Sequence, residues 1–558
     1  MTSRTSRRIA TAIAVALMVG SALSACVGIP SSSGVNTGVE IVSGGDSSFV
    51  DLPQPPPNNA PKDDILTDFM QAATSPEGDY SIARRFLTKA AAQKWNPTKN
   101  VVIREGVATM SAQPDGSINY SVTTKASVTA DGVYTEQSTP STATPNFQFQ
   151  KVNGQWRISA LDDQTVVSRA SFQQVFAPRA LYFFDPTFKY LVPDVRWFPI
   201  GSTVLTRVVS ALLGGPTAYL RQGAVVTAFP AGTQLDKPVD LRTGSVTVDL
   251  SAEAAADNSN IDRARMQQQL QSSLSSTNVT GVEITVRGAP LTVSGSSTAT
   301  TAVAVNNAPL IRSGKKFGFA PSLASIGRIS SQIVALDASA VTLGRDQTSA
   351  AALAKSGVYF ITNDASQPTL VDGRPHLIAP SIDPQRFVWS VPSTDGSAIR
   401  VTAPDGKHYA VPSSIPRKSR IVSLAVSHDG ARVLVYLQTS TGPELEVAGV
   451  LRRADGVPIG LGTPLELPIS TLNPIAATWV DDQSVAALGN SGDEDTVITY
   501  TVGGTASAPA STTNAVSIAG GSSIDDLRLL NSSDQLQQLR SSGWQSIGVK
   551  ASLLAIQQ

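Results

Sequence analysis

The stretch AVSHDGARVLVYL, residues 425–437, decides the fold of the C-terminal half of the chain. An acidic turn at Asp429-Gly430 leads into a run of apolar residues, a pattern typical of a buried β-strand. Two more stretches carry the same combination: APSIDPQRFVWSVP at 379–392 and ATWVDDQSVAALG at 477–489. Similar units that recur along a chain indicate a repeat architecture.

The spacing of the three turns indicates which architecture. Asp383 and Asp429 are 46 residues apart, and Asp429 and Asp481 are 52 residues apart. These intervals suit a four-stranded blade of a β-propeller. We therefore expect an all-β propeller over residues 305–558, with degenerate blades on either side of the three stretches and an undetermined blade number. An all-β sandwich is the alternative.

Residues 200–295 predict a small α/β domain. STVLTRVVSALLGGP has the periodicity of a helix that buries one face, begins near Ser202 or Thr203 and stops at Gly214-Gly215-Pro216. Alternating strands and a second helical segment follow. The order of helix, strands, helix and strand predicts one layer of helices on a sheet.

Residues 61–165 predict an α+β domain. KDDILTDFMQAA and SIARRFLTKAAAQKW are amphipathic helices, and strands follow them. FQFQKVNGQWRIS predicts a β-hairpin, because alternating aromatic residues flank the turn Asn153-Gly154. An order of helices first and an antiparallel sheet after them resembles that of NTF2-like domains.

Residues 166–199 form an aromatic connector between these two domains. Pro178, Pro186, Pro193 and Pro199 exclude a long helix here. The connector is either an ordered strap that lies across its neighbours or an exposed patch that binds a partner. The second interpretation makes a candidate partner surface of Tyr182, Phe183, Phe184 and Trp197.

The first 25 residues predict a lipoprotein signal peptide. Three arginines precede an uncharged run of about fifteen residues, which is too short for a membrane span of about 20 residues and suits a secretory signal. The next four residues, Leu23, Ser24, Ala25 and Cys26, resemble the lipobox of bacterial lipoproteins. That resemblance implies cleavage between Ala25 and Cys26, and an S-diacylglycerol and an N-palmitoyl group on Cys26. Two or more acyl chains hold a protein durably on a membrane.

Residues 26–60 predict a flexible tether that ends in three prolines. Cys26 is the only cysteine, so no internal disulfide stabilises the chain. With 43 basic and 43 acidic residues, the balanced charge argues against nucleic acid as a partner.

The order of these segments resembles the LpqB lipoproteins of actinobacteria over essentially the whole chain. The segments are the lipobox, ILTDFMQAA…ARRFLTKAAAQKW, ALYFFDP…LVPDVRWFP, VLTRVVSALLGGP and VDLS, followed by a weak propeller. The resemblance implies a GerMN-like domain at 200–295. It also implies an extracytoplasmic, lipid-anchored accessory of a sensor histidine kinase, MtrB of the MtrA–MtrB system, that affects envelope and cell-division signalling.

The sequence gives no reason to expect an enzyme. The histidines His376, His408 and His428 all lie in the expected propeller, and no serine occupies a G-x-S-x-G elbow. Neither a thiol pair nor a histidine pair with metal-ligand spacing is present, so we expect no metal and no cofactor. The alternative function is an envelope protein that binds or processes cell-wall glycan.

Overall fold

The computed structural model describes residues 53–558 apart from 243, 257–258, 278, 302–304, 470–472, 493, 508–509 and 541–542. The predicted signal peptide, the lipobox Leu23–Cys26 and most of the tether therefore lie outside the described residues. The first described region has the α+β organisation that the sequence predicts, and its elements are α2 (Lys62–Ala72), α3 (Ser81–Arg84), α4 (Lys89–Lys94), β1 (Asn100–Ala112), β2 (Ile118–Thr129), β3 (Tyr134–Ala143), β4 (Asn146–Val152), β5 (Gln155–Ala160) and β6 (Thr165–Ser168).

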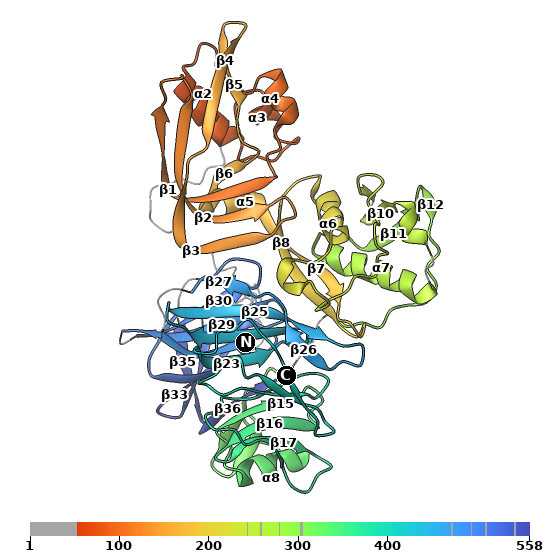
Figure 1. Cartoon of the computed structure of the whole chain (residues 1–558), viewed down its shortest axis with the longest axis vertical. Helices are drawn as coiled ribbons and strands as arrows, with labels where there is room; N and C mark the ends of the chain where they lie inside the picture. The colour runs from red at the N-terminus through yellow and green to blue at the C-terminus, as the bar shows by residue number, and fades with distance from the viewer. Residues whose placement is uncertain are drawn as a thin grey trace, which may run out of the picture. The chain divides into compact units, whose positions relative to one another are not determined.

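The sheet of this region has the order β5-β4-β2-β1-β6, with β3 also paired to β2 (Figure 1). The helices close one side with a core that includes Phe69, Phe86, Trp95 and Phe147. The predicted hairpin is confirmed: β4 and β5 pair, and Asn153 and Gly154 both have positive φ. Two central residues with positive φ match the right-handed twist of the flanking strands.

The aromatic connector folds as a short helix and a hairpin, α5 (Arg169–Val175), β7 (Phe176–Phe184) and β8 (Leu191–Pro199). The two strands pair along their full length from Phe176↔Pro199 to Phe184↔Leu191. The prolines fit because each strand of a two-stranded sheet keeps one edge free of ladder hydrogen bonds.

The next region is α/β, as expected. Its elements are α6 (Val204–Leu213), η1 (Ala218–Leu220), β9 (Asp240–Arg242), β10 (Ser245–Leu250), η2 (Ala252–Ala255), α7 (Asn260–Leu274), η3 (Ser275–Thr277), β11 (Gly281–Val286) and β12 (Ala289–Pro290). α7 connects the parallel strands β10 and β11. Thr203 precedes α6, but its side chain does not cap the helix. The capping box is instead on α7, where Ser259 and Asp262 bond each other's backbone.

The C-terminal region is a propeller, as the repeated turns predict. Its first elements are β13 (Leu310–Ser313), β14 (Lys316–Phe319), α8 (Gly327–Ala335), β15 (Ala340–Leu343), β16 (Ser349–Ala354), β17 (Gly357–Thr362), β18 (Thr369–Asp372), β19 (Ser381–Ile382), β20 (Val388–Ser390), β21 (Arg400–Thr402) and β22 (His408–Ala410). It continues with β23 (Arg420–Val426), β24 (Arg432–Gln438), β25 (Pro443–Arg452), β26 (Pro458–Leu461), β27 (Leu465–Leu467), β28 (Asn473–Trp479), β29 (Ser484–Ser491), β30 (Glu494–Thr501) and β31 (Ala510–Thr512). The last elements are β32 (Ala515–Ala519), η4 (Ile524–Asp526), β33 (Arg528–Asn531), β34 (Gln535–Arg540), β35 (Gly543–Lys550) and β36 (Leu553–Gln557).

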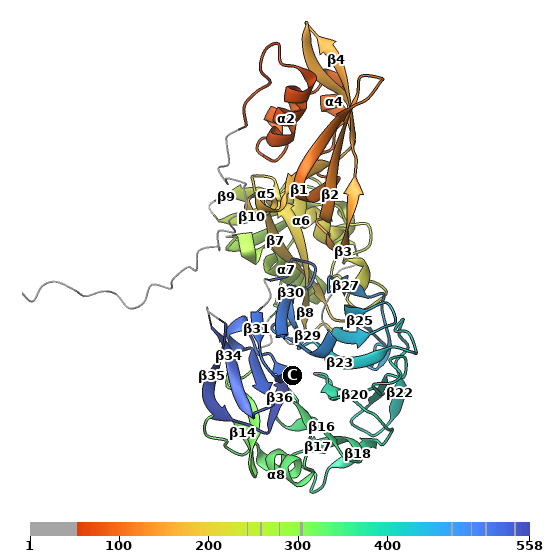
Figure 2. The same ribbon diagram turned by 90° about the vertical axis from the view of Figure 1, so that its left-hand side faces the viewer.

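The blades form a closed ring (Figure 2). Their inner strands follow one another around it in the order β15, β19, β23, β28, β32 and β36. β36 closes the ring because it pairs with β13 on one side and with β15 on the other. The described residues thus make six blades, and the sixth combines β36 with β13 and β14 from the start of the region.

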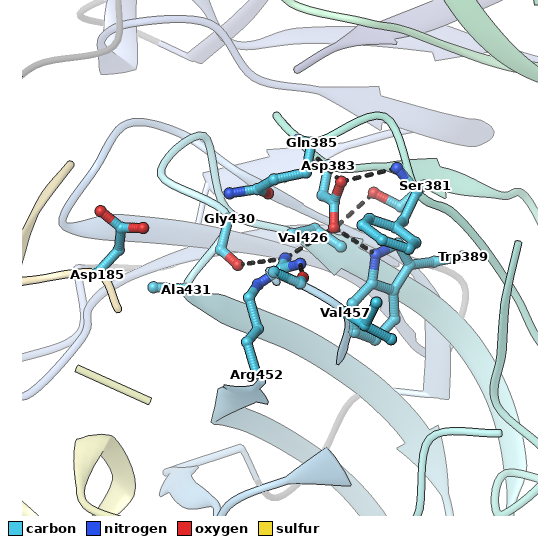
Figure 3. Close-up of polar contacts among 12 residues, drawn as sticks. Asp185, Ser381, Asp383, Gln385, Trp389, Val426, Gly430, Ala431, Arg452 and Val457 are labelled. Carbon is cyan, nitrogen blue, oxygen red and sulfur yellow. Dashed lines mark hydrogen bonds and ion pairs between the residues drawn. The ribbon is translucent and has the colours of Figure 1, made fainter. Parts of the chain in front are cut away.

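The acidic turn at Asp383 joins two neighbouring blades (Figure 3). Asp383, which lies between β19 and β20, accepts hydrogen bonds from Trp389 Nε1 at 3.2 Å and from Arg452 Nη2 at 2.7 Å. Arg452 belongs to the next blade and also donates to the carbonyl of Gly430. A related contact joins the next two blades, where Arg432 pairs with Asp429 of its own blade and donates to the backbone carbonyl of Asp482 in the following blade. The two arginines therefore join adjacent blades, and an aspartate of a repeated turn pairs with each of them.

Replacing Arg452 with methionine should destabilise the propeller strongly. The side chains of Arg452 and Asp383 are 3% and 0% exposed, so the substitution leaves a buried carboxylate without its partner. We expect a loss of about 3–5 kcal/mol in the free energy of unfolding, measured by urea denaturation. The neighbouring pair Arg453–Asp455 is 48% and 58% exposed and provides the control. Arg453→Met should cost less than about 1 kcal/mol, and equal losses in the two variants would contradict the proposed role of the buried pair.

Candidate functional site

The structure buries the predicted partner surface. Phe183 and Phe184 are both 0% exposed, and Trp197 is 7% exposed. Tyr182 is half-buried, and burial is the main cause that raises the pKa of its hydroxyl to about 12. The interpretation as an exposed patch is therefore wrong for Phe183, Phe184 and Trp197, and the connector is an ordered strap.

The rings are buried because the β7–β8 hairpin belongs to the cores on both sides of it. Phe183 packs in one cluster with residues of α6 and α7, while Trp197 packs with Tyr134 and Phe172. The Trp197 ring centroid lies 5.8 Å from that of Tyr134 and 4.9 Å from that of Phe172. Aromatic density alone could not distinguish a shared core from an exposed patch, because both require large apolar side chains.

A buried ion pair fixes the hairpin, and sequence reasoning missed it. Arg196 Nη2 lies 2.8 Å from Asp194 Oδ2, and their side chains are 3% and 1% exposed. Asp194 also accepts hydrogen bonds from the backbone N–H and the hydroxyl of Thr217, and Arg196 donates to the carbonyl of Gly215. The sequence could have indicated this pair, because Asp194 and Arg196 are two residues apart and residues at that spacing lie on the same face of a strand.

The three histidines do not meet in one site. His376 is exposed at a turn, and His408 is exposed on β22. His428 is 5% exposed, and burial chiefly lowers the pKa of its imidazole, which favours the neutral form. It lines a cavity of about 40 Å³ among the inner strands, beside Thr478 and Gln558.

The carboxylates that could support chemistry serve local structure. Asp63 and Asp64 lie in the first turn of α2, and Asp525 and Asp526 form part of η4. Asp163 accepts the backbone N–H of Asn96. Across the residues that the structure describes, no group of three His, Cys, Asp or Glu side chains is placed to hold a metal ion. Within the same residues, no helix is both long enough and apolar enough to span a membrane.

Family profiles match the chain in three consecutive segments. The profile described as "Lipoprotein LpqB, N-terminal domain" matches residues 55–173, and that of "Sporulation and spore germination" matches 180–292. The profile described as "Lipoprotein LpqB beta-propeller domain" matches residues 327–551.

Curated relatives match over part of their length. Lipoprotein LpqB of Thermobifida fusca is 32% identical over 218 residues, which are 37% of this chain and 34% of the relative. Lipoprotein LpqB of Corynebacterium diphtheriae is 32% identical over 241 residues, 42% of this chain and 40% of the relative. The aligned part thus spans about a third to two fifths of these relatives.

Solved structures match individual regions. The tandem GerMN domains of the sporulation protein GerM from Bacillus subtilis are 21% identical with a TM-score of 0.18, covering 23% of this chain and 45% of that chain. A putative TolB from Agrobacterium tumefaciens is 12% identical with a TM-score of 0.25, covering 31% of this chain and 65% of that chain. Two LpqB profiles flank a sporulation and germination profile in the order of the three folded regions, and the curated relatives carry the same family name. The chain belongs to the LpqB lipoprotein family.

Proposed function

We propose that this protein is a non-enzymatic accessory of a sensor histidine kinase, anchored by lipid on the extracytoplasmic face of the cell membrane. The kinase is MtrB of the MtrA–MtrB system, which the family resemblance implies. One observation supports a binding role rather than a catalytic one. The acidic turns and aromatic rings that could have formed a catalytic site make contacts between blades or lie in domain cores. We also propose that residues 61–165 form an NTF2-like domain.

Such an accessory acts by equilibrium coupling. It must bind one signalling state of the kinase more tightly than the other, because a ligand without differential affinity shifts no population. A coupling of about 1–3 kcal/mol changes the kinase equilibrium several-fold to a hundredfold. Anchoring on the same membrane raises the effective concentration, so a weak interface suffices.

We place the kinase interface at an exposed bulge of the first region. The pairing of β1 with β2 shifts register between Glu105 and Thr109, and Gly106 has a φ of 68°. Bulges of this kind redirect side chains away from the regular pleat. Val107 is 92% exposed and Met110 is 43% exposed on the same strand. These apolar side chains replace the buried rings of the hairpin as candidates for partner contact.

Glycan processing, the alternative function, would require two carboxyl groups that converge on a substrate. Glu446 on β25 lies directly across from Glu466 on β27, and Glu444 lies nearby. Burial, followed by the charges of Glu444 and Glu466, raises the pKa of Glu446 to about 7. We assign this pair to electrostatic strain within the blade, because like charges directly opposite on neighbouring strands repel.

The anchor is tested by Cys26→Ser. This substitution removes the thiol that would carry the diacylglycerol, so we expect an unprocessed precursor or a protein released from the membrane. Mass spectrometry of the mature N-terminus and membrane fractionation measure the two outcomes. A wild-type protein with an unmodified Cys26, or one cleaved well before it, would contradict the proposed anchor.

The interface is tested by the double variant Val107→Ser and Met110→Ser. Both side chains are exposed, so Tm should stay within about 2 °C of wild type while the effect on kinase phosphorylation falls. The readout is kinase phosphorylation in membranes that hold the anchored protein. Val516→Ser alters a half-exposed valine of the propeller and should leave phosphorylation unchanged. A double variant that stays folded and signals like wild type would rule out this interface.

The raised pKa of Glu446 should make the free energy of unfolding depend on pH. Its folded pKa is raised above the ordinary value, so ionisation is less favourable in the folded state, and the destabilisation develops as pH rises from about 4.5 to 7. Glu446→Gln should therefore increase the free energy of unfolding at pH 8 by on the order of 1 kcal/mol, with little effect at pH 4.5. Urea denaturation at both pH values measures the difference. Loss of a wall-degrading activity in this variant would instead favour the enzyme.

A further inference from the structure

A groove of about 630 Å³ lies on the outer part of the blade formed by β19–β22. Its size is within the range of small-molecule sites in proteins. It lies outside the blade contacts described above. Its walls come from the segment after β18, from the start of β21 and the loop before it, and from β22 and the loop after it. The lining includes Arg374, Arg400, His408, Tyr409, Ser413 and Arg417.

The groove is positively charged. Three arginines and one histidine line it, and none of its described lining residues is acidic. Asp372, which is 2% exposed, pairs with two of the guanidinium groups, those of Arg374 and Arg400. One carboxylate therefore faces two arginines. Arg417 is exposed and makes no ion pair among the described residues.

Asp372 holds two of the arginines in place. Arg374 donates from Nε and Nη2 to Asp372, with the shortest distance 2.6 Å, and from Nη1 to the carbonyl of Ala398. Arg400 Nη1 lies 3.4 Å from the same carboxylate and its side chain is 36% exposed. Cations fixed before a ligand arrives lose little freedom when it binds. The planar fork of a guanidinium matches the oxygens of a phosphoryl group.

The rest of the lining suits a hydroxylated ligand. The Ser413 hydroxyl oxygen is buried without a hydrogen-bond partner in the part of the chain that the structure describes. His408 directs Nδ1 to Thr402 at 3.0 Å, which leaves Nε2 for another partner. Tyr409 adds an aromatic face, and Ile399, Val411 and Ile415 contribute apolar walls.

We propose that this groove binds a phosphoryl group carried on a sugar or polyol, with Arg400 and Arg417 as its main charged contacts. The phosphate would face the guanidinium groups, and the hydroxyls would meet Ser413 and the edge of Tyr409. This site goes beyond the kinase-accessory role and does not depend on it. Two sources share the chemistry, a phosphorylated glycan and a phospholipid headgroup.

Isothermal titration of the purified full-length chain tests the proposal with three soluble probes. Glucose 1-phosphate represents the glycan source, glycerophosphoglycerol represents the lipid headgroup, and glucuronate offers a carboxylate on the same kind of ring. We expect at least one phosphorylated probe to bind more tightly than glucuronate, with an affinity that falls as salt rises. The tighter of the two phosphorylated probes identifies the source.

Two variants and a control connect the binding to the groove. Arg400→Gln and Arg417→Gln should each weaken binding about fivefold or more, while Arg328→Gln, an exposed arginine on α8, should leave it unchanged. Arg417 is exposed, so its variant should keep the wild-type Tm even if Arg400→Gln loses stability. The proposal is overturned if neither phosphorylated probe binds, if glucuronate binds as tightly, or if Arg417→Gln binds like wild type.

Discussion

The burial of the β7–β8 hairpin is the constraint on which the first two regions depend. All nine residues of β8 are buried, so neither face of this strand is exposed to water. The hairpin supplies Phe183 to one core and Trp197 to another, and the ion pair of Asp194 with Arg196 holds it against the segment after α6. Removing one charge would leave the other buried without a partner, which is far more costly than losing a surface pair.

The propeller uses charge in the same way. Arg452 reaches back from its own blade to the carboxylate of Asp383 in the blade before it. Arg432, which is paired with Asp429 of its own blade, reaches forward to the backbone carbonyl of Asp482 in the next blade. A charged side chain that is buried and hydrogen-bonded in this way stabilises the ring and cannot contact a substrate. Cations that the framework does not neutralise fully are found in the groove beside β22, where Arg400 and Arg417 remain accessible.

Local patterns predicted much of this architecture. The acidic turns, the Asn153-Gly154 hairpin and the helix at α6 follow from residues close together in sequence, and all three are present. The interpretation that Trp197 is exposed was wrong because the burial of its ring depends on Tyr134 and Phe172, which are not its neighbours in sequence. The groove was missed for the same reason, because Arg374, Arg400 and Arg417 meet only after the blade has folded. The pair of Glu446 with Glu466 depends on a strand register that alternation alone does not fix.

The composite sixth blade has a consequence for the order of folding. Leu310 pairs with Ala555, so the ring cannot close until residues near both limits of the propeller have emerged and met. Contacts between such distant residues carry a large loop-closure entropy and form slowly. We therefore expect the five other blades to pack first as an open arc. Its two ends expose strand edges until the sixth blade forms. Until β36 pairs with β13, the open edges are accessible to proteases and can pair with other chains, so the last strand of the propeller ends this exposure.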